Sequence, residues 1–328
     1  MRRKKIGKKQ VFVMFLIVVL LLVMIYSGLR ILESTVFLNR EEERPRTTKT
    51  IHREEGDYFP KQDMTVILVM GIDEEGPVAS SNSYRNSGEV DMAALVILDQ
   101  TQETVSILCL NRDTMLSMPV LGLGGRQAGS FYGQLALSHT YGSGLEDSAE
   151  NTRKTISDFL YGLHIDYYVA MHMDAIPVLN DAVGGVTVNV TEDFSEVDAT
   201  IGMGQQTLMG QQSIHFVRTR KDVGDQLNIS RIRRQEEYIR SFVDVFRKKQ
   251  MENSNFVASV YENTAQYIVT DCSVNAISGL AQRCSEYELL EITTPEGENV
   301  MGKEYYEFYA DEEALDKLIL ELFYAPKE

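Results

Sequence analysis

A long apolar stretch lies near the N-terminus, where residues 11–29 carry no charge. At about 1.5 Å per residue, a helix of this length spans roughly 28 Å, enough to cross a bilayer core. A cleavable signal peptide has a shorter apolar region and a small-residue cleavage site, and the following RILESTVFL offers none. Six of the first ten residues are basic, so residues 1–10 are expected to stay in the cytoplasm. The pattern predicts a single-pass, uncleaved anchor in the cell membrane, with the rest of the chain outside.

A polar and charged segment at residues 30–62 follows and is predicted to form a stalk. Residues 63–328 then carry the pattern of one folded domain. The runs MTVILVMGID (64–73), DMAALVILD (91–99), ETVSILCL (103–110), DYYVAMHM (166–173) and VTVNV (186–190) predict strands, and the second and third predict a hairpin. Residues 149–161 and 174–183 predict helices. This order indicates an α/β fold with a central mixed sheet flanked by helices, an α-β-α sandwich.

The C-terminal third changes to a helical period. Ile232, Tyr238, Phe242 and Phe246 fall on one face of a helix that begins at Arg231. This face could line an apolar groove or simply pack into the core. Further helices are expected near 254–268, 273–283 and 311–323, with YELLEI (287–292) as a strand.

Composition excludes a general nucleic-acid role. Setting aside the six N-terminal cations leaves 26 of 32 basic residues against 48 acidic ones, a net charge of −22 for the rest. Three cysteines are too few for a disulfide framework. Cys109 is predicted to be a buried thiol, whereas Cys272 and Cys284 could be paired or free.

Against this acidic background, six cations fall within the seventeen residues 218–234. Arginines at the start of the predicted helix oppose the helix dipole, which favours an anion bound there. Arg218 and Arg220 alternate in VRTR, so on an extended segment both would point to the same side. The alternative is a solvated surface with neighbouring carboxylates as ion-pair partners. Arg112, in LNRDT, follows a predicted strand at the end where ligands usually bind.

Two carboxylates stand at strand ends, Asp73 after the first strand and Asp91 at the start of the second. Together with a phosphate they would suit Mg²⁺; a turn residue is the alternative for each. No zinc-ligand spacing and no GxSxG motif occurs.

These motifs resemble the LytR–CpsA–Psr family of bacterial cell-wall enzymes. The resemblance covers residues 64–246 and rests on VMGID, VDMAALVILDQ, LNRDT, TYGSG, DAVGGVTVNV, R-x-R and R-x-x-RQ. It implies a membrane-anchored protein with an external catalytic domain. It further implies transfer of a glycopolymer from a polyprenyl-pyrophosphate carrier to peptidoglycan, with formation of a phosphodiester bond, and partners that include membrane lipid. The acidic composition predicts no nucleic-acid partner.

Site residues follow from the resemblance position by position. It assigns Mg²⁺ binding to two carboxylates, pyrophosphate binding to four arginines and substrate binding to an Arg–Gln pair. These are, in that order, Asp73 and Asp91; Arg112, Arg218, Arg220 and Arg231; Arg234 and Gln235.

Some positions depart from the family pattern. Where the family has an arginine beside the metal site, this chain has Glu89, and Arg85 could replace it from the loop. The spacing between Asp73 and Asp91 is also longer than the family pattern. Asn111 stands in place of proline, and Gln134 in place of lysine. Two alternatives therefore stay open: a hydrolase at the same site, or a non-catalytic wall-binding or regulatory ectodomain.

Overall fold

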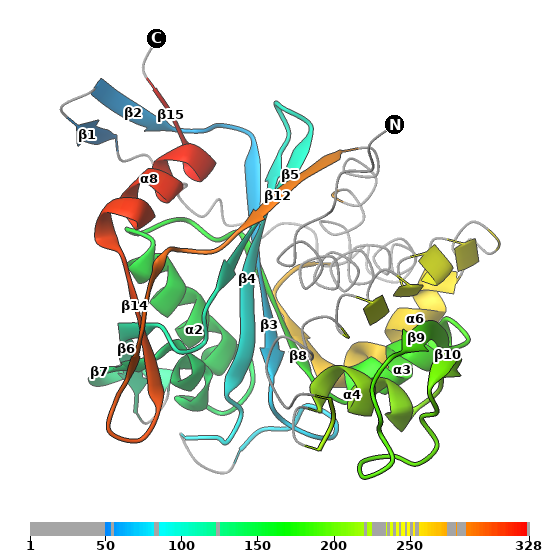
Figure 1. The fold of residues 1–328 in the computed structure, drawn as a ribbon. Coiled ribbons are helices and arrows are strands. Elements are labelled where there is room, and N and C mark those ends of the chain that lie inside the picture. Colours follow the sequence, from blue (N-terminus) through cyan, green and yellow to red (C-terminus); the bar gives the residue numbers. More distant parts are fainter. Residues whose placement is uncertain are drawn as a thin grey trace, which may run out of the picture.

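The computed structural model describes residues 50–53, 56–81, 85–122, 125–219, 222–224, 256–273 and 287–326, with single positions or short stretches at 234, 237–238, 241–242, 244–246, 248–249, 252 and 280. A six-stranded sheet forms its centre (Figure 1). Its order is β11 (Ile268–Thr270), β8 (Tyr167–His172), β3 (Met64–Ile72), β4 (Val90–Asp99), β5 (Thr104–Leu110) and β12 (Glu288–Thr293). β3 runs parallel to β8 and antiparallel to β4, so the sheet is mixed, as the sequence predicts.

The central strands are apolar at nearly every position because both faces of the sheet are covered. All nine residues of β3 are buried. Val66, Leu68 and Met70 pack to one face, and the alternate residues Ile67 and Val69 pack to the other. The first face carries α2 (Glu146–Phe159), the short 3-10 helix η3 (Leu135–Thr140) and α8 (Glu312–Phe323) (Figure 1).

A second apolar cluster lies beside the sheet. It joins α3 (Ala175–Ala182), α4 (Gln211–Arg218), α6 (Phe256–Thr264) and the hairpin of β9 (Val186–Val190) and β10 (Gly204–Leu208). The rings of Tyr238, Phe242 and Phe246 stack in sequence within this cluster, each at most 2% exposed. The helical face that carries them is therefore core, which decides between the two interpretations left open by the sequence.

Several small strand pairs were not predicted. β6 (Met115–Leu121) and β7 (Gln127–Gln134) form one hairpin, and β13 (Gly297–Met301) and β14 (Tyr306–Ala310) form another. β1 (Ile51–Arg53), β2 (Gly56–Pro60) and β15 (Tyr324–Pro326) form a three-stranded sheet. The last residues assigned to the polar stalk thus pair with the C-terminal strand. The 3-10 turn η4 (Ala265–Tyr267) links α6 to β11.

Cys109 is buried in the core, as predicted, and Cys272 is a buried thiol, whereas Cys284 lies outside the described residues. The predicted anchor, residues 11–29, and most of the predicted helix at 273–283 also lie outside them. Within the described part of the chain, no helix is both long and apolar enough to span a membrane.

Candidate active site

The two predicted metal carboxylates meet at one edge of the central sheet. β3 and β4 are antiparallel, so the end of β3 lies beside the start of β4, and the intervening loop 74–88 takes up the longer spacing. The backbone N–H of Asp73 donates to the carbonyl of Glu89 over 2.9 Å. The register shifts at this point: Met92 faces Gly71 and Val90 faces Ile72, which leaves Asp91 as the extra residue of a bulge. Bulges of this kind often re-aim a side chain near a functional site.

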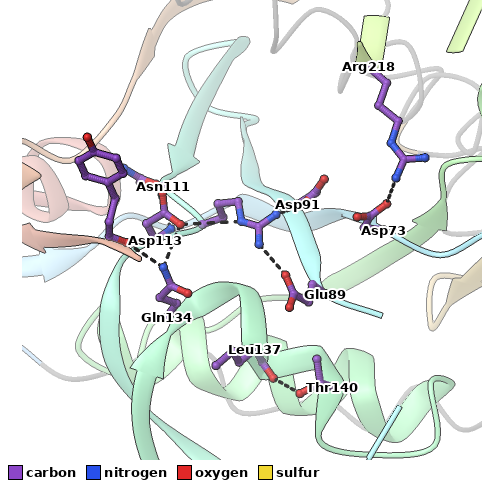
Figure 2. Close-up of polar contacts among 11 residues, drawn as sticks. Asp73, Glu89, Asp91, Asn111, Asp113, Gln134, Leu137, Thr140 and Arg218 are labelled. Atoms are coloured by element: carbon purple, nitrogen blue, oxygen red, sulfur yellow. Dashed lines mark hydrogen bonds and ion pairs between the residues drawn. The ribbon is translucent and has the colours of Figure 1, made fainter. Parts of the chain in front are cut away.

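Arg112 reaches the same edge from β5. Ala93 faces Leu110 in the β4–β5 register, so continuing two residues brings Arg112 beside Asp91. Its guanidinium forms an ion pair with Asp91 and a second with Glu89, where Nη2 lies 2.6 Å from Oε2 (Figure 2). Its side chain is 34% exposed, so the group remains accessible to a ligand.

The neighbour of Arg112, Asp113, extends this charged network. Burial raises the pKa of the Asp113 carboxyl, the positive charge of Arg112 acts in the opposite direction, and Glu89 adds to the rise. Asp113 Oδ1 also accepts a hydrogen bond from Gln134 Nε2 at 3.1 Å. Asn111 Oδ1 accepts the backbone N–H of Asp113 at 3.0 Å, which fixes the turn after β5.

Arg218 enters from the second cluster. It is the last residue of α4, where a cation is favoured by the helix dipole. Its Nη2 lies 2.6 Å from Asp73 Oδ1 and its Nη1 lies 3.8 Å from Glu75 (Figure 2). The extended geometry expected for VRTR is therefore wrong at Arg218, because the buried residues Ile214, Phe216 and Val217 place this stretch on a helix. The extended conformation begins only at Thr219.

The other predicted arginines are located differently. Arg220, Arg231 and Gln235 lie outside the described residues. Arg234 is 4% exposed, and its guanidinium contacts Glu192 and the backbone carbonyls of Phe216 and Thr219. It also lies over the Phe194 ring, at 5.4 Å from the centroid. These contacts indicate a role in fastening the chain after α4, and a direct substrate contact stays a prediction.

The donor set can be tested against Mg²⁺. Among the described residues, no group of three or more His, Cys, Asp or Glu side chains could hold a metal ion on its own. Asp91 Oδ1 is buried and forms an ion pair with Arg112, and Asp73 Oδ1 forms an ion pair with Arg218. Mg²⁺ commonly uses one or two carboxylates with phosphate oxygens and water, and a phosphate that draws the two arginines away would leave both carboxylates available to it. The two carboxylates therefore fit Mg²⁺ once a phosphate ligand is present.

The loop between the carboxylates is held by two histidines that sequence reasoning did not select. His172 Nδ1 pairs with the carbonyl of Gly76 at 2.9 Å, and His139 Nδ1 pairs with the carbonyl of Gly88 at 3.0 Å. Asn86 Nδ2 adds a bond to the carbonyl of His139 at 2.8 Å. Both histidines follow an apolar run, but only the tertiary fold reveals that they hold the same loop.

Glu89 was recognised only as a departure from a family pattern. Because it lies two residues before Asp91, the strand period could have placed both carboxylates toward Arg112. Arg85, the suggested replacement for the family arginine, lies with its guanidinium 5.6 Å from the centroid of the Tyr141 ring.

Protonation of His139 should destabilise the fold. Burial lowers its pKa from 6.5 to about 4, although the bond to Gly88 opposes this effect. Below pH 6.5 the unfolded chain therefore binds a proton at His139, whereas the folded protein stays unprotonated there. The free energy of unfolding consequently falls as the pH falls toward 4. Between pH 6.5 and 4, this one histidine lowers the free energy of unfolding by about 3 kcal/mol. Urea titrations of the wild type and of His139→Gln should show a smaller loss for the variant; equal losses would contradict the assignment.

Comparisons with known proteins find a matching family and named relatives. The LytR_cpsA_psr family model matches residues 30–323. Over 171 residues the chain is 26% identical to the polyisoprenyl-teichoic acid–peptidoglycan teichoic acid transferase TagU of Oceanobacillus iheyensis, covering 52% of this chain and 48% of that protein. It is 22% identical to TagT of Bacillus subtilis over 298 residues, 88% of this chain and 83% of that protein. Against TagU, then, the match spans about half of the relative's length.

Solved structures give a likeness of fold. The crystal structure of B. subtilis TagV superposes with a TM-score of 0.56 at 23% identity, over 80% of this chain and 96% of that one. At this identity the likeness establishes the mixed α/β architecture alone.

Proposed function

Since this chain belongs to the LytR_cpsA_psr family, we propose that it transfers a glycopolymer from a polyprenyl-pyrophosphate carrier to peptidoglycan by forming a phosphodiester bond. The relatives named as teichoic acid transferases support this reaction class. One observation carries the proposal. Arg112 pairs with Asp91, Arg218 pairs with Asp73, and the two carboxylates stand at the adjoining ends of β4 and β3. Figure 2 shows Arg218, Asp73 and Asp91 at this end of the sheet.

The arrangement suits a pyrophosphate substrate. Arginine guanidinium groups bind phosphate oxygens through paired hydrogen bonds and keep their charge at all relevant pH values. In the free protein these groups are paired with carboxylates that are each more than a quarter exposed. A diphosphate could therefore replace these contacts without opening the core.

In the reaction, a sugar hydroxyl of the acceptor attacks the phosphorus that carries the glycan. The new O–P bond forms as the bond to the bridging oxygen breaks, and polyprenyl phosphate leaves. Arg112 and Arg218 would neutralise the charge that develops on the departing phosphate. Asp73 and Asp91 would hold Mg²⁺, which when bound supplies further positive charge to the phosphate oxygens. Asp91, Asp222 and Asp225 are the candidates for the group that accepts the hydroxyl proton.

The proposed location follows from the same reaction. The pyrophosphate head of a membrane-embedded carrier and the peptidoglycan acceptor would both be reached at the outer face of the membrane, which agrees with an anchor at residues 11–29 and an external domain. The protein would then be a single-pass membrane protein whose partners are the lipid-linked glycan and peptidoglycan.

The experiment uses the full chain in detergent micelles, a short-chain lipid-pyrophosphate sugar and Mg²⁺, with and without an acceptor glycan. Product joined to the glycan supports transfer, and its loss with EDTA supports the metal. Release of phosphorylated sugar in both conditions would instead identify a hydrolase. Tight donor binding without any turnover would identify a non-catalytic ectodomain.

Glu89 should compete with the donor for Arg112. Replacing Glu89 with glutamine removes a carboxylate 2.6 Å from Arg112 Nη2. Because both side chains are at least one third exposed, the pair is worth no more than about 1 kcal/mol, and we expect about fivefold tighter donor binding. Calorimetric titration with the short-chain donor measures the change. Weaker binding by the variant would indicate that Glu89 assists the donor.

A further inference from the structure

The two hairpins beside Arg112 present an unusual number of exposed aromatic side chains. β13 is exposed at every position and β7 at its first six. Tyr132 on β7 is 57% exposed, and Tyr309 and Val300 on β14 and β13 are 40% and 44% exposed. Exposed apolar side chains gathered on one surface commonly mark a binding site.

Backbone registers place these side chains on one face. Val300 faces Glu307 across the β13–β14 hairpin and Tyr309 faces Glu298, whereas Phe308, between Glu307 and Tyr309, turns the other way and is buried. On the neighbouring hairpin, Tyr132 faces the exposed Ser117, and the flanking Leu116 and Met118 are buried. The outer face of the two hairpins therefore includes Ser117, Tyr132, Glu298, Val300, Glu307 and Tyr309.

The hairpins lie side by side and share hydrogen bonds (Figure 1). Phe308 donates its backbone N–H to the carbonyl of Asp113 at 2.9 Å, and Thr114 and Phe308 form a β-bridge. The hydrogen bond that Tyr309 donates to Glu307 raises the pKa of Tyr309, and the nearby phenol of Tyr132 adds to this effect. Tyr132 and Tyr309 are thus neighbours across the two hairpins.

This face continues directly into the candidate active site. Gln134 follows Tyr132 by two residues and shares its side of β7. Its Nε2 donates to Asp113 Oδ1 at 3.1 Å and to the carbonyl of Tyr306 at 2.8 Å (Figure 2). Asp113 adjoins Arg112. A polymer lying on the tyrosines would therefore reach the phosphate-binding edge.

Charge selects the kind of polymer. Residues 297–310 contain three glutamates and one lysine, and two of the glutamates stand on the outer face. Such a face repels polyanionic chains and anionic phospholipid headgroups. Carboxylates accept hydrogen bonds from sugar hydroxyls, and tyrosine rings stack on the apolar C–H faces of pyranose rings.

We propose that the outer face of these hairpins binds an uncharged glycan strand and seats it as the acceptor beside Arg112. This inference rests on the proposed function for the identity of the site, and it adds where the acceptor binds. Tyr132 and Tyr309 would supply the stacking rings, and Glu298 and Glu307 would accept hydroxyl hydrogen bonds.

The test uses the full chain in detergent micelles and a soluble oligomer of N-acetylglucosamine. Tyr132→Ala/Tyr309→Ala should bind the oligomer about tenfold more weakly, since two stacking contacts are lost. With a lipid-pyrophosphate donor, the KM for the acceptor should rise by a similar factor while donor affinity and kcat stay unchanged. Tyr132→Phe/Tyr309→Phe keeps the rings and should bind almost as well as the wild type. Tyr161→Ala, an exposed tyrosine elsewhere in the described residues, is the matched control.

A second variant guards against a folding defect. Ser117→Arg leaves both rings in place but covers the face with a long side chain, so it should cause the same loss. Unchanged oligomer binding in the double alanine and Ser117→Arg variants would overturn the inference. The inference would also be overturned if these variants bind the glycan normally but differ from the wild type in oligomeric mass. The same holds if they bind the glycan normally but lose the quenching of tyrosine fluorescence by brominated lipid in nanodiscs. If the wild type binds the oligomer but never turns over the donor, the proposed reaction fails while the glycan site stands.

Discussion

Replacing Arg218 with alanine should lower turnover of a lipid-pyrophosphate donor by about 100-fold or more, the usual cost of losing one group that stabilises transition-state charge. Arg218 is the last residue of α4, and its Nη2 lies 2.6 Å from Oδ1 of Asp73, which follows β3. Its side chain is 43% exposed, so the ion pair itself adds little to stability and the variant should remain folded. Single-turnover kinetics with the short-chain donor measure the effect.

The matched control is Arg53→Ala, which removes another partly exposed arginine, on β1, that is paired with a carboxylate, Asp316 of α8. It should leave turnover within about twofold of the wild type. Arg218→Lys should keep part of the activity, because an ammonium preserves the charge but not the paired hydrogen bonds. If Arg218→Ala turns over donor at the wild-type rate, the convergence of the two arginines is not a phosphate site.

Arg234→Ala should instead lower the free energy of unfolding by about 3–5 kcal/mol, because it leaves the largely buried Glu192 without its partner. The Arg234 side chain is 5% exposed and that of Glu192 is 18% exposed. The guanidinium also donates hydrogen bonds to the carbonyl of Phe216, at 2.9 Å from Nε, and to the carbonyl of Thr219, the residue after Arg218. Chemical denaturation of wild type and variant measures the free energy of unfolding, and Arg53→Ala should change it by less than about 1 kcal/mol.

A double variant separates structure from substrate binding at this position. Arg234→Met/Glu192→Leu removes both charges and should recover much of the lost stability. If this variant is stable and still binds donor normally, Arg234 acts only through packing. If it is stable but binds donor more than tenfold weaker, the substrate-binding role predicted from the sequence gains support.

The sequence predicted the central sheet well because burial on both faces leaves a continuous apolar run. Residues 64–73, 91–99 and 103–110 each match a strand to within one residue at either end. The β6–β7 hairpin was missed because QAGSFYGQ is exposed along most of its length and carries no apolar alternation. The same holds for GENVM in β13.

The sequence predicted which residues belong to the candidate site, but it did not predict which of them contact one another. Asp73, Asp91, Arg112 and Arg218 were each singled out, and the structure brings all four to one edge. Their pairing depends on strand register and on the bulge at Asp91, which no residue spacing reveals. Arg218 was expected on an extended segment because VRTR alternates. The preceding QQSIHFV, however, buries one face of a helix in the second cluster, and this packing outweighs a four-residue alternation.

The connection between the two carboxylates is pinned independently at both ends, by His172 and Asp174 on Gly76 and by His139 and Asn86 near Gly88. Two inner residues are held as well, because Val78 and Ser81 donate their backbone N–H groups to the carbonyls of Gln266 and Ser143. An insertion between Val78 and Ser81 would therefore cost hydrogen bonds in addition to the small entropy of closing a longer loop.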